Sequence, residues 1–204
     1  APESGERRWF RPIDLWCDAR PAYGRNGTAN AAAFEAEARR VIAEHARGGG
    51  SGRNEGRRPL FLMVALQDPH SYYTVERRWA SLYSHEWPLR NTWSGMVSRM
   101  DANVGGVVEA LRNVEMWEST LFVFVSDNGS PVSGWKPAGT NAPLRGGKAS
   151  LWEGGVRTVA VVAGGWLPTS RRGMKLRGLA HITDLYATFC SVAAGVGRGG
   201  HGCP

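Results

Sequence analysis

Cysteine is scarce in this chain, and the three that occur, Cys17, Cys190 and Cys203, form no C-x-x-C pair. That spacing excludes a zinc knuckle and a dense disulfide framework. No apolar run is long enough to cross a bilayer, and neither a signal peptide nor an initiator methionine opens the sequence. We therefore expect a fragment of a longer protein, without a membrane span.

Lysine is scarce as well, because 22 of the 25 basic residues are arginines, and the formal net charge is +7. The arginines are scattered and form no stripe with aromatic residues, which argues against a nucleic-acid-binding module. A basic surface attracts anions such as sulfate and phosphate. The phosphate-loop pattern is absent around Lys148, however, since Ala142 stands where it needs glycine and Ala149 where it needs a hydroxyl.

The sequence does hold enough apolar material for one core, since 42% of its 204 residues are hydrophobic and nine are tryptophan. We expect residues 1–204 to form a single domain, or most of one. Residues 47–58, RGGGSGRNEGRR, offer nothing apolar to bury and are rich in glycine. This stretch is predicted to be a flexible surface insertion.

Helices are predicted in three segments. Residues 30–46 and 92–111 place apolar side chains at i, i+3 and i+4 spacing, which is typical of a helix with one face on a core. Residues 183–195 are predicted to form a closing helix capped by Thr183.

Strands are predicted at three continuous apolar runs, residues 59–66, 120–126 and 156–164. The order strand, helix, strand from residue 59 to residue 126 predicts a right-handed parallel crossover. The expected fold class is therefore α/β, with helices covering a mostly parallel sheet.

Polar residues follow the second of these strands, where Asp127, Asn128 and Gly129 end the run. One interpretation is a hairpin turn, for which Asn-Gly is a strong signal. The other is a metal site, because ligands of open α/β sheets bind beyond the carboxyl ends of the strands. Carboxylate and amide oxygens suit Ca²⁺ or Mg²⁺, although two ligands alone cannot hold such an ion. The long loop over residues 130–155 favours a functional role.

Two further sets of candidates lie near strand ends. His70 follows the run 59–66 and reaches the same sheet edge if the strands are parallel, but on spacing alone a structural histidine beside Pro69 is the favoured interpretation. In the long loop, Arg145 and Lys148 flank two glycines, so a cationic side chain can approach an anion with little steric hindrance. The alternative for that pair is a solvated basic loop.

Four segments together carry a family resemblance: FLMVALQDPH, LFVFVSDNG, APLRGGKASLWEGGVR and HITDLYATF. Their order resembles that of the sulfatase family, and the similarity to its arylsulfatase B-like members runs from about Asp14 to Gly195. The resemblance implies an alkaline-phosphatase-like fold, with a mostly parallel mixed sheet flanked by helices. Residues 1–204 would then be one incomplete sulfatase catalytic domain.

The resemblance also implies roles for single residues in a calcium-dependent sulfuric ester hydrolase. By position, Asp127 and Asn128 bind one divalent cation, Ca²⁺. Lys148 and Arg145 contact the substrate's sulfate group, and His70 contacts the sulfate and protonates the leaving alcohol. The expected substrate is a sulfated small molecule or a sulfated glycan.

The nucleophile of the family is missing from the sequence. Sulfatases use a formylglycine made within a C/S-x-P-x-R segment, whereas Cys17 is followed by Ala19 and Pro21 at the proline and arginine positions. We expect the formylglycine in the missing N-terminal part, and an isolated fragment without activity. A non-catalytic sulfatase-like protein that binds sulfated glycans remains an alternative. So does a phosphodiesterase or phosphonate hydrolase of the same superfamily, although Asn128 argues against it.

The resemblance favours a secreted or lysosome-like location. The pattern Asn26-Gly27-Thr28 is an acceptor for N-glycosylation and points the same way. Asn128-Gly129-Ser130 is a second such pattern, which we expect to be unmodified because a glycan there would block the metal.

Overall fold

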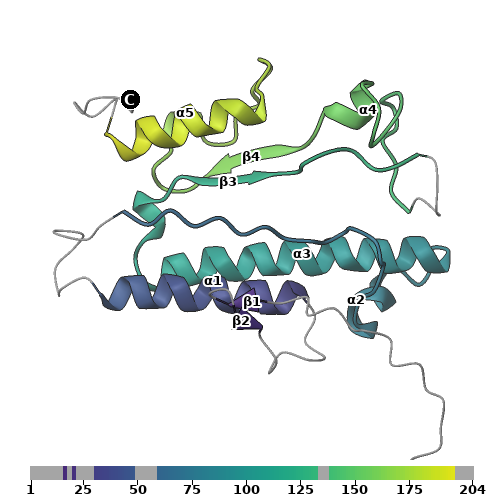
Figure 1. The fold of residues 1–204 in the computed structure, drawn as a ribbon, viewed down its shortest axis with the longest axis horizontal. Coiled ribbons are helices and arrows are strands. Elements are labelled where there is room, and N and C mark those ends of the chain that lie inside the picture. Colours follow the sequence, from purple (N-terminus) through teal and green to yellow (C-terminus); the bar gives the residue numbers. More distant parts are fainter. Residues whose placement is uncertain (1–15, 18–19, 22–29, 49–58, 133–137, 196–204) are drawn as a thin grey trace, which may run out of the picture. The chain divides into compact units, whose positions relative to one another are not determined.

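The computed structural model describes residues 16–17, 20–21, 30–48, 59–132 and 138–195 (Figure 1). The chain divides into two compact units, one of residues 1–39 and 64–107 and the other of residues 40–63 and 108–204. Near its start, β1 (Trp16–Cys17) and β2 (Arg20–Pro21) form a short antiparallel pair. The glycosylation pattern at Asn26 and the predicted insertion beyond Gly48 lie outside the described residues.

Two long helices, α1 (Asn30–Arg47) and α3 (Pro88–Asn113), confirm both predicted helices, and residues 30–39 and 88–107 of them are counted in the first unit. α3 begins four residues before the predicted start at residue 92, because the fixed φ and missing N–H of Pro88 suit the first turn of a helix. The helices lie side by side (Figure 1), and the Arg39 side chain donates to the Gly106 carbonyl at 3.4 Å. A side chain at position 106 would collide with Glu35 of α1, so glycine permits this close approach.

The apolar run at residues 59–66 differs from its prediction as a buried strand. It is not paired with another strand among the described residues, and Phe61 and Met63 are 71% and 76% exposed. An apolar run becomes a buried strand only where neighbouring strands receive its N–H and C=O groups. Downstream of this run come α2 (Arg77–Ala80) and a 3-10 turn at Ser81–Tyr83.

The second unit contains a two-stranded sheet, in which β3 (Phe122–Val125) and β4 (Ala160–Ala163) confirm the two later strand predictions with shorter bounds. The strands are antiparallel, with Phe122 opposite Ala163 and Val125 opposite Ala160. A parallel crossover needs a helix long enough to return the chain along the sheet, and the described residues of the connection, 126–132 and 138–159, hold only the one-turn helix α4 (Glu153–Val156). No parallel pair occurs among the described residues, so the parallel sheet stays a prediction.

The closing helix α5 (Ile182–Ala193) confirms its prediction, but its cap is His181 and not Thr183. His181 has extended backbone geometry, its side chain accepts from the Thr183 N–H, and Asp184 accepts from the His181 N–H at 2.7 Å. This capping box needs an acid three residues after the cap, which fixes the start of the helix at His181. A 3-10 turn at Thr169–Arg171 precedes α5.

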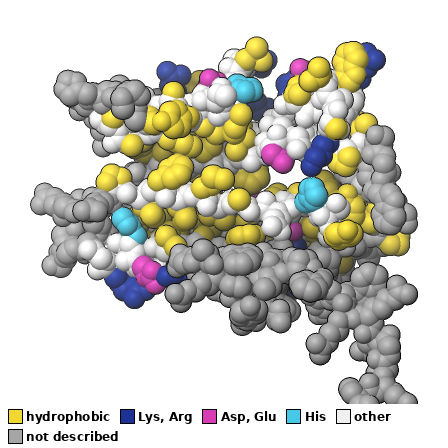
Figure 2. Space-filling model, viewed as in Figure 1, with side chains coloured by type: hydrophobic (Ala, Val, Ile, Leu, Met, Phe, Trp, Pro, Cys, Tyr) yellow, Lys and Arg dark blue, Asp and Glu magenta, His cyan; other side chains and the backbone are white. Residues whose placement is uncertain are grey.

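Apolar side chains stay exposed in the second unit. Figure 2 shows hydrophobic side chains gathered in the region of β4 and α5, where Val161 is 50% exposed and Tyr186 75%. A two-stranded sheet cannot bury its own strands, which accounts for the exposure of β4. Among the residues that the structure describes, none of the helices has the length and apolar character that a bilayer span requires.

Candidate functional site

The chain leaves β3 through Ser126, whose N–H still pairs with the Val159 carbonyl at 3.0 Å. Beyond it, the Asn128 N–H donates to Asp127 Oδ1 at 2.8 Å, and Asn128 Nδ2 donates to the Gly129 carbonyl at 3.0 Å. These bonds orient both side chains and leave Asn128 Oδ1 without a partner among the described residues. The strand that pairs with β3 begins only at Ala160, so Asn128-Gly129 is not the turn of a two-residue hairpin.

Asn141 holds the chain just after this pair. Its Oδ1 accepts the Ser130 N–H at 2.8 Å, and its Nδ2 donates to the Ser130 carbonyl at 2.7 Å and to the Gly146 carbonyl at 3.0 Å. One side chain thus joins the segment that follows β3 to the loop that carries Arg145 and Lys148.

Lys148 is attached to the same point through its main chain, because its N–H donates to the Ser130 carbonyl at 3.1 Å. The turn around it is closed by Ser150, whose N–H and Oγ both donate to the Gly147 carbonyl, at 3.0 and 2.7 Å. The Lys148 side chain is exposed and has no hydrogen-bond partner within the described ranges. Its ammonium group is therefore available to an anion.

Glycine makes this packing possible. A Cβ added at Gly129 would lie 1.8 Å from the Gly154 carbonyl oxygen, and one at Gly147 would lie 2.3 Å from the Ser130 carbonyl oxygen. These are main-chain obstacles that no rotamer change relieves. Main-chain hydrogen bonds from Gly129 to Gly155, 3.0 Å, and from Gly154 to Arg145, 2.7 Å, complete the contact.

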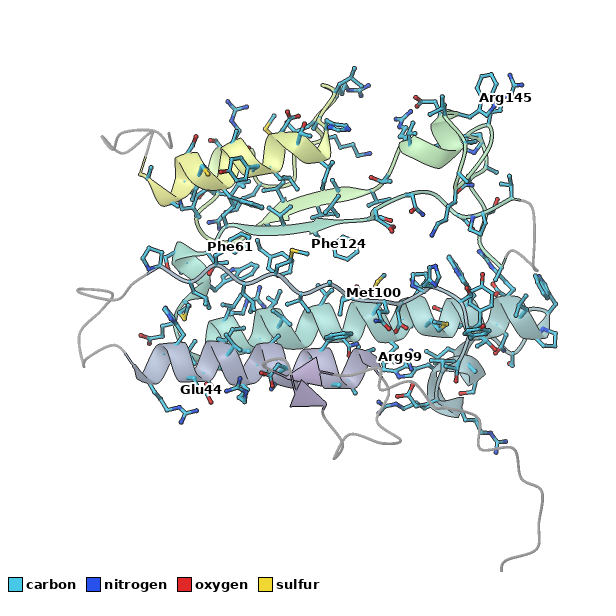
Figure 3. The ribbon with its side chains drawn as sticks, viewed as in Figure 1. Glu44, Phe61, Arg99, Met100, Phe124 and Arg145 are labelled. Carbon is cyan, nitrogen blue, oxygen red and sulfur yellow. The ribbon has the colours of Figure 1, made fainter. Side chains whose placement is uncertain are left out.

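Arg145 lies beside α4 (Figure 3), and its guanidinium carbon is 3.6 Å from the centre of the Trp152 ring. This stacking fixes the plane of the guanidinium group while its edges stay exposed. Glu153, the first residue of α4, and Arg157, the residue that follows its end, form an exposed ion pair at 3.5 Å, so these two charges largely neutralise each other.

His70 belongs to the first unit, whereas Asp127, Asn128, Arg145 and Lys148 belong to the second, where hydrogen bonds of the main chain bring them together. The His70 N–H donates to the Gln67 carbonyl at 2.9 Å and closes a turn. His70 Nδ1 lies 2.7 Å from the Ser71 carbonyl oxygen, which can only accept a hydrogen bond. Nδ1 therefore carries a hydrogen, and Nε2 is the ring nitrogen that makes no hydrogen bond among the described residues.

The segment around His70 is held by Arg99 of α3. Arg99 Nε and Nη2 each donate to the Asp68 carboxylate at 2.8 Å, Nη1 donates to Glu76 at 2.9 Å, and Nη2 donates to the Thr74 carbonyl at 3.3 Å. The side chains of Arg99 and Asp68 are each only 8% exposed. The contact is thus a buried, bidentate ion pair with a second, more exposed carboxylate.

Ionisation follows from these contacts. Hydrogen bonding to Asp68 raises the pKa of Arg99 above its ordinary value, against the opposing effect of burial. Burial alone would raise the pKa of Glu76, but its backbone hydrogen bond and the hydrogen bond and charge of Arg99 hold that pKa below the ordinary glutamate value. Arg99 and Glu76 are therefore both charged at neutral pH.

Asp127 and Asn128 offer the type of oxygen ligand that a calcium ion prefers, but two residues are too few to bind the ion. Their available carboxylate and amide oxygens are hard ligands at adjacent positions, and Ca²⁺ takes roughly six to eight oxygens. Within the described ranges no group of three or more His, Cys, Asp or Glu side chains could hold a metal ion. The two residues therefore fit as one part of a larger ligand set.

Two structural residues were missed by the sequence reasoning. Asn141 precedes Ala142-Pro143, and asparagine near proline is a turn signal that could have marked it. Arg99 interrupts the apolar stripe of α3 between Met96 and Asn103, both buried, and a charge on a buried face signals an internal ion pair.

Comparison with known proteins gives a consistent family. The family model described as Sulfatase matches residues 18–196. Arylsulfatase J of Mus musculus is 36% identical over 140 residues, which are 68% of this chain and 22% of that protein. N-acetylgalactosamine-6-sulfatase of Rattus norvegicus is 30% identical over 137 residues, which are 66% of this chain and 25% of that protein. The chain thus spans about a quarter of the length of these curated relatives.

A solved structure is similar in both sequence and fold. The crystal structure of Ps i-CgsB in complex with k-i-k-neocarrahexaose matches with a TM-score of 0.70 and 30% sequence identity. The match covers 80% of this chain and 34% of that chain. A second crystal structure of Ps i-CgsB matches with a TM-score of 0.57 at 30% identity, over 65% of this chain and 27% of that one.

Proposed function

Because the chain belongs to the sulfatase family, and with it to the α/β class of the alkaline-phosphatase-like fold, we propose that the protein that contains it hydrolyses sulfate esters. Residues 1–204 form one part of the catalytic domain in this proposal. The observation that carries it is the hydrogen bond from the Lys148 N–H to the Ser130 carbonyl, 3.1 Å. That bond keeps an unpaired cation next to the strand end that carries Asp127 and Asn128.

Asp127 and Asn128 bind one divalent cation, calcium. The carboxylate of Asp127 is exposed, and the hydrogen bond of Asn128 Nδ2 to Gly129 turns its Oδ1 toward a ligand. The remaining ligands come from elsewhere in the longer protein. When bound, the calcium ion polarises the sulfate oxygens of the ester.

Lys148 and Arg145 bind the sulfate group. Negative charge spreads over the sulfate oxygens as the S–O bond breaks, and a fixed ammonium group stabilises that charge more than it stabilises the ground state. The main-chain attachment of Lys148 and the stacking of Arg145 on Trp152 preorganise both cations. Preorganised charges need no rearrangement during the reaction.

His70 contacts the sulfate and protonates the leaving alcohol. Because the Nδ1 hydrogen is bound to the Ser71 carbonyl, His70 acts as an acid in its doubly protonated form, which gives the Nε2 proton to the leaving oxygen and becomes neutral. The nucleophile is a formylglycine in another part of the longer protein, because residues 1–204 contain no C/S-x-P-x-R segment.

The substrate class is a sulfate ester on a small molecule or a glycan. An oligosaccharide is supported by the similar crystal structure that contains k-i-k-neocarrahexaose, and an N-acetylgalactosamine sulfate by the name of one relative. A secreted or lysosome-like location is part of the same proposal.

The test is hydrolysis of 4-methylumbelliferyl sulfate by the complete protein. We expect turnover that Lys148→Ala abolishes and that Lys175→Ala leaves unchanged, since Lys175 is an exposed lysine remote in sequence from the loop. Retention on a heparin column without turnover of any sulfate ester would overturn the proposal of an enzyme and favour the non-catalytic, glycan-binding alternative.

A further inference from the structure

All four hydrogen bonds that Arg99 donates among the described residues go to one short stretch of chain, residues 68–76. Its three guanidinium nitrogens bind Asp68, Thr74 and Glu76, and no other group among the described residues. In Figure 3 the side chain extends from α3 toward the segment that leads into α2. The anchored points therefore lie on both sides of His70 in the sequence.

The turn geometry transmits this anchoring to His70. Asp68 lies inside the turn that the His70 N–H closes on the Gln67 carbonyl at 2.9 Å. The two hydrogen bonds from Arg99 to the Asp68 carboxylate, both 2.8 Å, fix the position and the orientation of that turn relative to α3. The His70 ring itself is exposed and makes no contact with Arg99 that could hold it directly.

Stability alone is a poor explanation for this cluster. Burying a charged pair brings little net stabilisation over apolar side chains of similar size, because desolvation offsets the attraction. What a planar, bidentate arginine provides is geometric precision, which a lysine ammonium cannot supply to two carboxylates at once.

We propose that Arg99 is a positioning residue that sets the position and orientation of the His70 ring for proton transfer to the leaving alcohol. This inference rests on the proposed function, in which His70 protonates the leaving alcohol. Arg99 contacts neither substrate nor reacting atoms in this role. Its loss lets the turn at residues 67–70 shift, so the proton donor is misplaced.

The decisive readout is the dependence of kcat on the leaving group. Phenols with a low pKa leave without help, whereas poor leaving groups need the proton, and general acid catalysis contributes on the order of 100-fold or more. For Arg99→Met we expect kcat to fall about 10-fold or more with phenyl sulfate and less than about 3-fold with 4-nitrophenyl sulfate. A stability defect alone would lower both rates by the same factor.

A double-mutant cycle separates positioning from any independent role. In a His70→Ala background, Arg99→Met should cause no further loss with phenyl sulfate, because the group that it positions is gone. Arg90→Met is the matched control, since Arg90 also lies on α3 but stacks on Trp93 at 4.6 Å and approaches Glu86. It should leave the leaving-group dependence unchanged.

Milder variants cover the case in which Arg99→Met does not fold. Arg99→Lys keeps the positive charge but cannot form the two parallel hydrogen bonds to Asp68. Glu76→Gln weakens the contact of Arg99 with Glu76, whose side chain is 40% exposed. Both should show the same leaving-group selectivity in weaker form. Equal losses with both substrates, or additive losses in the cycle, would overturn the inference and leave the proposed function standing.

Hydrogen exchange distinguishes failure of the proposed function from failure of this inference. In the complete protein, the amides of residues 67–76 should exchange at least about 10-fold faster in Arg99→Met than in Arg90→Met. If wild type turns over no sulfate ester but this difference is found, the anchoring of the His70 turn holds and the sulfatase proposal fails. Unchanged exchange would overturn the inference by itself.

Discussion

The side chain of Asn141 pairs with both main-chain polar groups of Ser130, accepting its N–H at 2.8 Å and donating to its carbonyl at 2.7 Å. This exchange reproduces the pairing of two neighbouring strands with a single side chain. The same carbonyl of Ser130 also accepts the Lys148 N–H at 3.1 Å. The position of the loop that carries Lys148 therefore depends on the side chain of Asn141.

Removing this side chain should destabilise the protein. Asn141→Ala leaves the half-buried Ser130 N–H and Gly146 carbonyl without this partner and removes one of the two donors to the Ser130 carbonyl. Each unsatisfied group costs about 1–3 kcal/mol when water cannot replace the lost partner. We expect Asn141→Ala to lower both the thermal unfolding midpoint and the hydrolysis rate. Asn113→Ala, at the exposed last residue of α3, is the control and should change neither. Equal midpoints for the two variants would contradict the role of Asn141.

Replacing a glycine by alanine should lower stability where the glycine is crowded and should not lower it where the glycine is open. Gly129→Ala places a Cβ 1.8 Å from a main-chain oxygen, whereas Gly178→Ala meets nothing within 4 Å. Forcing a methyl group into a packed region typically costs about 1–3 kcal/mol, and here the obstacle is main chain. Gly129→Ala should unfold at a lower denaturant concentration than wild type, with Gly178→Ala unchanged. A stable, active Gly129→Ala would show that the contact between Gly129 and Gly154 is not required.

Calcium should be required at the strand end. Chelation of the complete protein with EGTA should abolish hydrolysis of 4-methylumbelliferyl sulfate, and added Ca²⁺ should restore it. Asp127→Asn removes one charged ligand and should raise the calcium concentration needed for half-maximal activity by about 10-fold or more, as loss of a ligand charge weakens such sites. Asp101→Asn, an exposed acid on α3, should not change that concentration. Full activity of Asp127→Asn in EGTA would remove this residue from the metal site.

Acid should weaken the contact between Glu76 and Arg99. The pKa of Glu76 is lower in the folded protein than its ordinary value. Its contribution to stability is therefore fully present above the ordinary glutamate pKa, about 4.3, and is lost as the pH falls below it through the folded value. The stability difference between wild type and Glu76→Gln should be measurable at about pH 7 and should vanish in acid. A difference that persists in acid would mean that the charge of Glu76 is not what matters.

The helices could be predicted from the sequence because their signal is local. Apolar side chains recur every three to four residues in α1 and α3, and both helices form where that period occurs. The positions of the strands could also be predicted from a local signal, since Phe122–Val125 and Ala160–Ala163 fall within apolar runs. The direction of pairing was not predictable, because it depends on how the chain between the strands folds and not on the strands themselves.

The candidate site was predictable only as a set of residue types. Asp127, Asn128 and Lys148 are the residues that we propose for the chemistry, and their positions after a strand or after two glycines were visible in the sequence. The residues that hold these segments in place could not be predicted from the sequence. The hydrogen bonds between Asn141 and Ser130 span 11 residues, and those between Arg99 and Asp68 span 31. No periodic pattern marks a side chain whose partner lies that far away along the chain.

The attachment of residue 148 to residue 130 uses main-chain atoms alone, so it is indifferent to which side chain stands at position 148. Amino-acid replacements near this loop should consequently differ in cellular abundance. Replacements at Gly129 or Gly154, where a Cβ collides with a carbonyl oxygen, should reduce the amount of protein through cellular quality control. A replacement of Lys148 should leave a normal amount of inactive protein, so immunoblotting alone would overlook it.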